Sequence, residues 1–321
     1  MSSSKFEVIK PPKRIKFKRF CRGIYRKHRK EFITYKKGVP PIVNICNLMK
    51  ILVARLKPEI NKNYVRNSKY KEIDFIRGII EIIRNNTFWS RYNGKVPGKY
   101  LNKRHNQYCE WGVYECLYRI ILHEYFKRKK FTKLHQQSID STFVSNLFGS
   151  EWYGRNSQYK FKNGYNLQFQ VDINGLPFAA AIGTGNANDF PVGVALLKSS
   201  TFVETESERV KKNNRYKQVL YADSAYYGKE LYNLLKKKGI TPRIDGKYRN
   251  TRDPIKRAKI TNDKKKYKKV SGKRMVVENC NSWIKMYPKI QRVIEKTIKS
   301  YKGLLLLSMS ILAIGKIGKG K

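Results

Sequence analysis

The stretch that decides the fold is residues 217–228, Lys217-Gln218-Val219-Leu220-Tyr221-Ala222-Asp223-Ser224-Ala225-Tyr226-Tyr227-Gly228. Its first half is a short apolar run that predicts a buried β-strand, and the residues after Asp223 predict the start of a helix. An aspartate at the end of a buried strand lies at the carboxyl edge of an α/β sheet, where such folds bind their substrates. Asp223 could equally do no more than cap the helix behind it. The choice between these roles depends on which other carboxylates reach the same edge.

The chain is strongly basic. Its 321 residues contain 70 Lys and Arg against 23 Asp and Glu, which gives a formal net charge of +47. Such a charge repels itself in a compact chain and is typical of proteins that bind nucleic acid. Residues 1–38 are especially basic and predict a DNA-gripping arm, an import signal or a solvated tail. A basic membrane-surface protein and a ribosomal-type structural protein are the alternative classes.

Cysteine usage and hydropathy indicate where such a protein works. The five cysteines are scattered without a Cys-x-x-Cys pair, which argues against a zinc module or a disulfide framework and fits a reducing compartment. The longest apolar run, residues 304–314, is shorter than the roughly 20 residues that cross a membrane, so it predicts a buried core helix. No signal peptide is visible. We expect an intracellular protein without a membrane partner, in the cytoplasm or nucleoid of a prokaryote or the nucleus of a eukaryote.

The chain divides into three predicted regions. Residues 1–66 are a basic arm with one short helix. Residues 67–130 show isoleucines at three- and four-residue spacing, and their short basic helices indicate a helix-turn-helix-like DNA-binding domain or, alternatively, a helical packing domain. Residues 131–321 are α/β in pattern, with strands, a hairpin turning at Asn174-Gly175, and late helices. The highly charged stretch 247–269 in this last region is expected to be a loop or finger.

Three carboxylates of the third region can converge. Asp140 lies on the first predicted strand, Asp223 ends the fourth, and Glu278 lies on a late helix. An antiparallel meander, a parallel fourth strand beside the first and a helix over the sheet form a ribonuclease H-like mixed sheet with flanking helices. Carboxylates this close repel one another unless a cation lies between them. Two divalent ions are the usual solution, and they suit chemistry at a phosphodiester.

The late helix carries cations on the face of its carboxylate. Arg274 precedes Glu278 by four residues and Lys285 follows it by seven, so all three share one face. The pair could bind DNA phosphates, although Arg-x3-Glu alone is an ordinary surface ion pair. Two further residues are auxiliary candidates: Trp283 could pack or stack on a base, and Asp189 could assist the site or cap the next helix.

Taken together, these motifs resemble the DDE transposases of bacterial insertion sequences over residues 70–315. The matching pieces are Ile139-Asp140-Ser141-Thr142, Asn186-Ala187-Asn188-Asp189, Tyr221-Ala222-Asp223-Ser224-Ala225-Tyr226 and Arg274-x3-Glu278-x6-Lys285. The resemblance implies a catalytic and metal-binding triad on Asp140, Asp223 and Glu278, with Arg274 and Lys285 on phosphates. Many relatives carry a tyrosine three residues before the arginine, where this chain has Ser271.

The resemblance also implies an activity and its partners. A metal-activated water would cut double-stranded DNA at terminal inverted repeats, and the released 3′-hydroxyl would attack target DNA. The implied cofactors are two Mg²⁺ ions, which Mn²⁺ could replace, and the implied assembly is a homo-oligomer on DNA. The charge excess and Ser271 leave open a catalytically inactive, transposase-derived DNA-binding protein. An RNA-binding structural protein is the third hypothesis.

Overall fold

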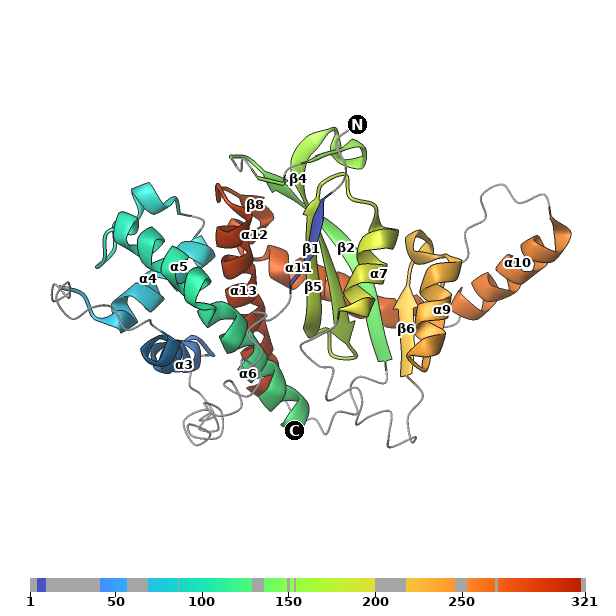
Figure 1. Ribbon diagram of the computed structural model, residues 1–321, viewed down its shortest axis with the longest axis horizontal. Coiled ribbons are helices and arrows are strands. Elements are labelled where there is room, and N and C mark those ends of the chain that lie inside the picture. The colour runs from blue at the N-terminus through green and yellow to red at the C-terminus, as the bar shows by residue number, and fades with distance from the viewer. Residues whose placement is uncertain are drawn as a thin grey trace. The chain divides into compact units, whose positions relative to one another are not determined.

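The computed structural model describes residues 5–9, 41–56, 69–85, 87–128, 136–148, 151–152, 154–199, 218–245, 253–268 and 271–318 (Figure 1). The chain forms two compact units, each built from segments that are far apart in sequence. The sheet unit comprises Met1–Lys10, Phe126–Ser145 and Trp152–Trp283, and the helical unit comprises Pro11–Tyr125, Asn146–Glu151 and Ile284–Lys321. Most of the basic arm, residue 135 and residues 201–217 lie outside the described residues. The predicted boundaries at 66 and 130 stay predictions.

The sheet unit is a mixed α/β structure. The main strands follow the order β1 (Phe6–Val8), β5 (Pro177–Thr184), β4 (Lys162–Asp172), β2 (Gln136–Asn146), β6 (Gln218–Ala222) and β7 (Ile240–Ile244). As predicted, β2, β4 and β5 form an antiparallel meander, and β6 runs parallel to β2 beside it. β7 then extends the sheet in parallel, and β3 (Gly154–Asn156) pairs with β4. Nearly every residue of β4 and β5 is buried, as expected for strands covered on both faces.

Two helices cover strands of this sheet. α7 (Asp189–Lys198) packs on β4 and β5, and α9 (Lys229–Lys237) packs on β7. The hairpin between β4 and β5 turns at Asn174-Gly175 as predicted: the Asp172 carboxylate accepts hydrogen bonds from the backbone nitrogens of Asn174 (3.0 Å) and Leu176 (2.8 Å), and Gly175 takes a φ of +70°. Side-chain capping and a glycine at positive φ thus fix the turn.

The structure corrects two expectations for charged segments. Much of 247–269, expected as a loop or finger, is the helix α10 (Pro254–Lys268), which begins at an Asp253 cap and contacts β7. Residues 6–8 of the predicted basic arm form β1, which pairs with β5. Both depend on interactions that sequence periodicity does not display: an N-terminal cap in the first case and a distant strand in the second.

The helical unit is held around a buried polar network. Lys289 is fully buried, and its Nζ lies 3.2 Å from Glu295 Oε1. Glu295 also accepts hydrogen bonds from Trp89 Nε1 (3.0 Å) and Ser300 Oγ (2.6 Å). Burial lowers the pKa of His105, whose ring hydrogen-bonds Ser300, to about 4, so this imidazole is neutral at physiological pH. The elements are α3 (Pro41–Leu56), α4 (Glu72–Asn85), η2 (Trp89–Arg91), α5 (Gly98–Trp111), α6 (Val113–Arg128), α12 (Pro288–Gln291), β8 (Arg292–Val293) and α13 (Ile298–Gly318).

α13 is the predicted apolar helix and is longer than expected. By length and composition alone, Ile298–Ile317 could cross a membrane, but 67% of its most apolar window is buried inside the structure. It contacts α3, α5 and α12 of the same unit. These contacts identify α13 as the core helix of the helical unit.

Candidate active site

The topology of the sheet unit brings the two predicted aspartates to the same level. β2 pairs with β6 in parallel, and Ser138 lies opposite Tyr221. Asp140 is two residues beyond Ser138, and Asp223 is two residues beyond Tyr221, so the same register aligns them at the carboxyl edge of β6. Asp140 also faces Phe169 of β4 in the antiparallel ladder. The central position of β2 therefore fixes Asp140 from both sides.

Asp223 caps the helix that follows it and lies at the carboxyl edge of β6. Its Oδ1 accepts a hydrogen bond from the backbone nitrogen of Ala225 (2.9 Å) and so caps the short helix η5 (Ser224–Tyr226). Its charge also acts on Asp140 and on Tyr267, which places the carboxylate among the groups of the site. The cap orients the side chain at the end of β6 and leaves it beside Asp140.

Arg274 joins the first and third carboxylates. It ends η6 (Ser271–Arg274), immediately before α11 (Met275–Lys285), and its Nη2 lies 2.5 Å from Oε1 of Glu278 on that helix. Its Nη1 lies 3.4 Å from Oδ1 of Asp140. The simpler alternative, an isolated surface ion pair on one helix, therefore does not describe Arg274. One guanidinium bridges a carboxylate of the sheet and a carboxylate of the helix.

Asn281 is a site residue that the sequence reasoning missed. Its Nδ2 lies within hydrogen-bonding distance of Asp140 Oδ2 (3.3 Å) and the backbone oxygen of Ser141 (3.4 Å), and the residue is buried. Asn281 follows Glu278 by three residues and Arg274 by seven, so it shares their helix face. That spacing was readable in the sequence, although an amide on a helix carries no signal by itself.

The electrostatics of Asp140 reflect its surroundings. The pKa of Asp140 is raised to about 7, chiefly by burial and in smaller part by the charges of Asp223 and Glu278. Arg274 lowers the pKa of Asp140 through their ion pair, but burial and the two carboxylates outweigh it. A buried carboxylate whose pKa is raised by neighbouring carboxylates is a pattern that often marks functional sites.

Tyr267 occupies the vicinity of the site from another element. It lies in the last turn of α10 and is 8% exposed. Burial raises the pKa of its hydroxyl, and the charges of Arg274, Asp223 and Glu278 all act on it. A tyrosine therefore lies near the arginine, although position 271, three residues before Arg274, is a serine.

The remaining predicted residues take varied places. The cap of α7 is Asn188, not Asp189, whose carboxylate instead accepts hydrogen bonds from Asn166 Nδ2 (2.8 Å) and Gln168 Nε2 (3.1 Å) of β4. Trp283 is half-buried, and its ring lies against the hairpin turn, since a Cβ on Gly175 would be 3.2 Å from it. Lys285 ends α11, seven residues after Glu278.

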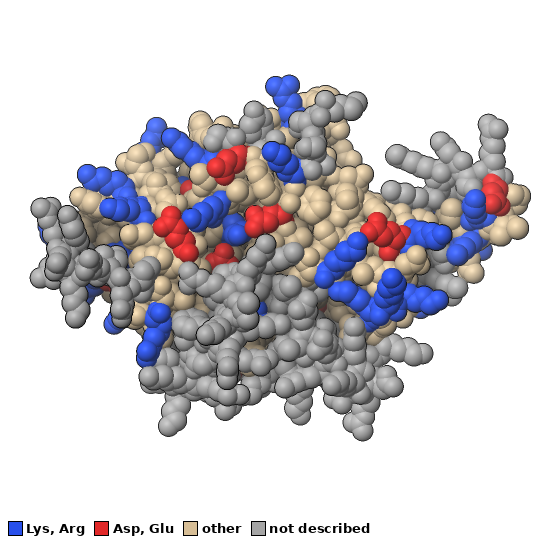
Figure 2. All heavy atoms as spheres, in the orientation of Figure 1, with Lys and Arg blue, Asp and Glu red and all other residues tan. Residues whose placement is uncertain are grey.

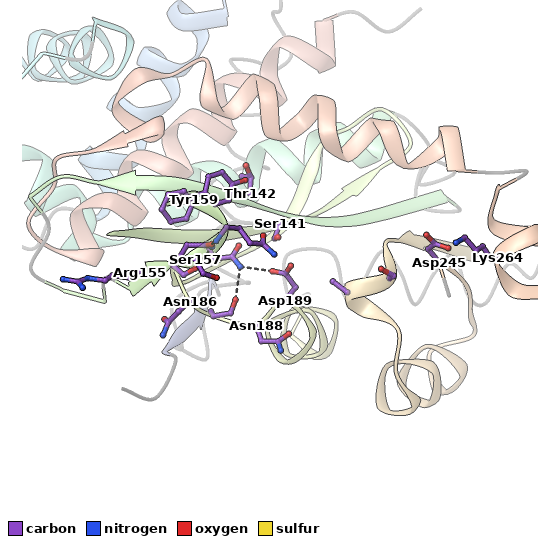
Figure 3. Close-up of a pocket in the computed structure, with 18 residues that line it drawn as sticks. Ser141, Thr142, Arg155, Ser157, Tyr159, Asn186, Asn188, Asp189, Asp245 and Lys264 are labelled. Atoms are coloured by element: carbon purple, nitrogen blue, oxygen red, sulfur yellow. Dashed lines mark hydrogen bonds between the residues drawn. The ribbon is translucent and has the colours of Figure 1, made fainter. Parts of the chain in front are cut away.

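A cavity of about 860 Å³ opens beside the aspartates (Figure 3). Ser141 and Thr142, which follow Asp140, line it together with Ser224, which follows Asp223. Asp245 and Lys264 lie at its far side and point toward one another in Figure 3. Amide side chains supply much of the remaining polar lining: Asn156, Gln158, Asn166, Asn186 and Asn188.

The three carboxylates are of the chemical type that binds a divalent cation, but their present arrangement does not form a metal site. Carboxylate oxygens are the ligands that Mg²⁺ prefers, and burial raises the pKa of Asp140 although Arg274 lies beside it. Among the described residues, no group of three or more His, Cys, Asp and Glu side chains is arranged to hold a metal ion. Arg274 supplies positive charge between Asp140 and Glu278 instead.

Comparison with known proteins identifies the family. A scan against protein-family models matches the Transposase DDE domain over residues 134–312, more than half of the chain. Searches found no matching curated protein and no matching solved structure. The matched range contains β2, β6 and α11, the elements that carry the three carboxylates. The chain belongs to the DDE-domain transposases.

Proposed function

We propose that this protein is an active DNA transposase. It cleaves transposon ends at terminal inverted repeats and joins them to target DNA by phosphodiester hydrolysis and transesterification. Asp140, Asp223 and Glu278 are its catalytic residues. The observation that carries the proposal is the convergence on Asp140: Arg274 bridges it to Glu278, and the charges of Asp223 and Glu278 act on it, within the matched family domain.

The three carboxylates would hold two Mg²⁺ ions, for which Mn²⁺ can substitute. When bound, such ions supply an activated nucleophile and stabilise the leaving oxygen at a phosphodiester. Asp140 must be deprotonated to bind a cation, and its raised pKa makes this step dependent on pH. Asn281 holds the Asp140 carboxylate in orientation through its amide nitrogen.

Arg274 and Lys285 would bind DNA phosphates near the scissile bond. Arg274 bridges two carboxylates, and its planar guanidinium would suit a phosphate beside the ions that these carboxylates would hold. The partners are double-stranded DNA bearing the terminal inverted repeats and target DNA, and the active form is a homo-oligomer on DNA. Its place is inside the cell, with the chromosome. The helical residues 67–130 are the candidate DNA-binding domain.

A second candidate is a catalytically inactive, transposase-derived DNA-binding protein. The observation that favours it is the ion-pair bridge from Arg274 to Asp140 and Glu278, which compensates the carboxylates without a metal ion. The two candidates predict different results when the carboxylates are neutralised.

The decisive experiment is cleavage of DNA carrying the inverted repeats that flank the gene, in the presence of Mg²⁺ or Mn²⁺. Asp223→Asn should reduce cleavage by about 10³-fold or more, since a metal ligand is removed. Asparagine can still accept the hydrogen bond from Ala225 and cap η5, so the variant should fold normally. Glu230→Gln, which removes an exposed carboxylate from α9, is the matched control and should retain full cleavage.

Equal cleavage by Asp223→Asn and native protein would reject catalysis at this site. Absence of cleavage by native protein, with tight binding to the same DNA that neither variant alters, would favour the inactive DNA-binding protein. Thermal melts of all three proteins show that the comparison is between folded molecules.

A further inference from the structure

α10 is a helix with almost no buried face. Of its described side chains, Tyr267 alone is buried, and Ile255 in the first turn is 82% exposed. A helix that is polar all round has little packing energy to hold it in place. Figure 1 shows α10 extending away from α9 and β6. Its last turn, which contains Tyr267, is therefore the part that attaches it to the sheet unit.

Several of the cations of α10 share one face, while others, such as Lys256 and Lys259, lie elsewhere around the helix. Arg257, Thr261, Lys265 and Lys268 follow one another at intervals of four, four and three residues, which places them in a stripe along the helix. A hollow of about 530 Å³ follows the same face and is lined in part by Arg257, Thr261 and Lys265. Figure 2 shows Lys and Arg side chains gathered over α9 and α10. Fifteen residues of helix span about 22 Å, a length over which duplex DNA presents many phosphates.

The stripe leads toward the candidate active site. Lys264 lies seven residues after Arg257 on this face and lines the cavity beside the aspartates. Tyr267, three residues later, lies where the charges of Asp223 and Glu278 act on it. The outer end of α10 is exposed and carries Arg257 beside an Asp253–Lys256 ion pair, and its inner end is adjacent to the carboxylates. A polyanion bound along the stripe would be directed to them.

We propose that α10 is a phosphate-binding track that holds the backbone of duplex DNA and leads it to the carboxylate site. Lysine and arginine suit phosphate oxygens, whereas recognition of base edges relies on bidentate pairs from rigidly placed side chains. The track therefore contributes affinity and position rather than sequence preference. This inference rests on the proposed function, since it supplies the DNA on which the carboxylates act.

The test measures binding without catalysis. Three charges are removed from the stripe by Arg257→Gln, Lys265→Gln and Lys268→Gln in the full chain. The control removes three charges from the neighbouring α9 by Lys229→Gln, Lys236→Gln and Lys237→Gln, none of them buried. Affinity for a fluorescent duplex is measured at several salt concentrations with EDTA present, for inverted-repeat DNA and for random DNA.

The stripe variant should lower the slope of log affinity against log salt by about 0.9 for each phosphate that is no longer neutralised, hence by roughly 2.7, on both duplexes. The α9 variant should change the slope by less than about 1. Equal reductions in the two variants would overturn the proposal, because the effect would then be one of net charge. A reduction confined to inverted-repeat DNA would also overturn it, because α10 would then read sequence. Since EDTA removes catalysis, failure here is distinguishable from failure of the Asp223→Asn experiment.

Discussion

The ionised carboxylate of Asp140 destabilises the folded protein, which is not expected of a residue with a purely structural role. This carboxylate is largely buried against Arg274 and Asn281, and two more carboxylates act on it. Its pKa is raised above the ordinary aspartate value, so the folded state binds the proton more tightly than the unfolded state. The stability that this protonation provides is fully present below about pH 4 and is lost as pH rises through about 7.

We therefore predict that Asp140→Asn removes a pH dependence of folding. Without divalent metal, the native protein should lose about 2–3 kcal/mol of unfolding free energy through this group between about pH 5 and pH 8. Asp140→Asn should lack that decrease and be the more stable protein at pH 8. Urea denaturation at several pH values measures the difference.

Glu230→Gln provides the control for this experiment, since an exposed carboxylate on α9 is replaced. It should keep the native pH dependence. Added Mn²⁺ should stabilise the native protein at pH 8 and leave Asp140→Asn unchanged. If the unfolding free energies of native and Asp140→Asn protein changed with pH in the same way, the pKa of Asp140 would not be raised in the folded state.

At this scale the sequence indicated the charged residues but not their neutral partners. Asp140, Asp223, Glu278 and Arg274 stood out because carboxylates and a guanidinium at helical or strand-end positions carry a chemical signal. Asn281 shares the helix face of Glu278, but nothing in the sequence distinguishes it from a solvated amide. Its role depends on β2 packing against α11, which is a tertiary contact.

At the scale of elements, a ladder of buried glutamines joins three strands. Gln170 of β4 donates to Gln137 of β2 (2.7 Å), and Gln137 donates to Gln218 of β6 (2.9 Å). All three residues are at most 4% exposed. Because a one-residue slip would break both hydrogen bonds, the ladder favours the register that aligns Asp140 with Asp223.

The glutamine ladder predicts that replacing one glutamine by leucine destabilises the protein more than replacing all three. Gln137→Leu should destabilise the protein by about 2–4 kcal/mol, because the buried amides of Gln170 and Gln218 would lose their hydrogen-bond partner. Replacing all three glutamines by leucine should cost less, because no buried amide is then left unpaired. Urea denaturation of the two variants tests this prediction. A triple variant with a lower free energy of unfolding than the single variant would contradict it.

The elements that sequence predicted well are those with their own periodicity. β4, β5 and β6 show apolar runs or alternation, and α7 and α11 have clear starts. β1 has three residues and exists because β5 offers an edge, which no local pattern reveals. α10 escaped prediction because its exposed, cationic sequence has no apolar stripe, and its helix depends instead on the Asp253 cap and the Tyr267 contact.

At the scale of the whole molecule, the path of the chain interleaves the two units. The first strand of the sheet unit comes from residues 6–8, and the core helix of the helical unit comes from residues 298–318. Neither unit is therefore a continuous piece of sequence. The chain passes from one unit to the other several times between its ends.

We predict that a fragment of residues 131–321 does not fold as a separate domain. It contains α13 but lacks α3 and α5, which pack on it, so the buried run Leu304–Leu307 would be exposed to water. It also lacks β1, which leaves the edge of β5 unpaired. Size-exclusion chromatography should show aggregates where the full chain, treated alike, remains dispersed. A monomeric fragment with cooperative unfolding would contradict the prediction.

The cap that Asp223 places on η5 has a genetic consequence under the proposed function. Aspartate and asparagine codons differ by one base, so a single G-to-A transition converts Asp223 into asparagine. The new side chain can still cap the helix, and the altered copy folds and binds the same DNA without cutting it. Each such copy competes with its active parents for their shared ends. A family of these genes would then slow its own spread as its silent members multiply.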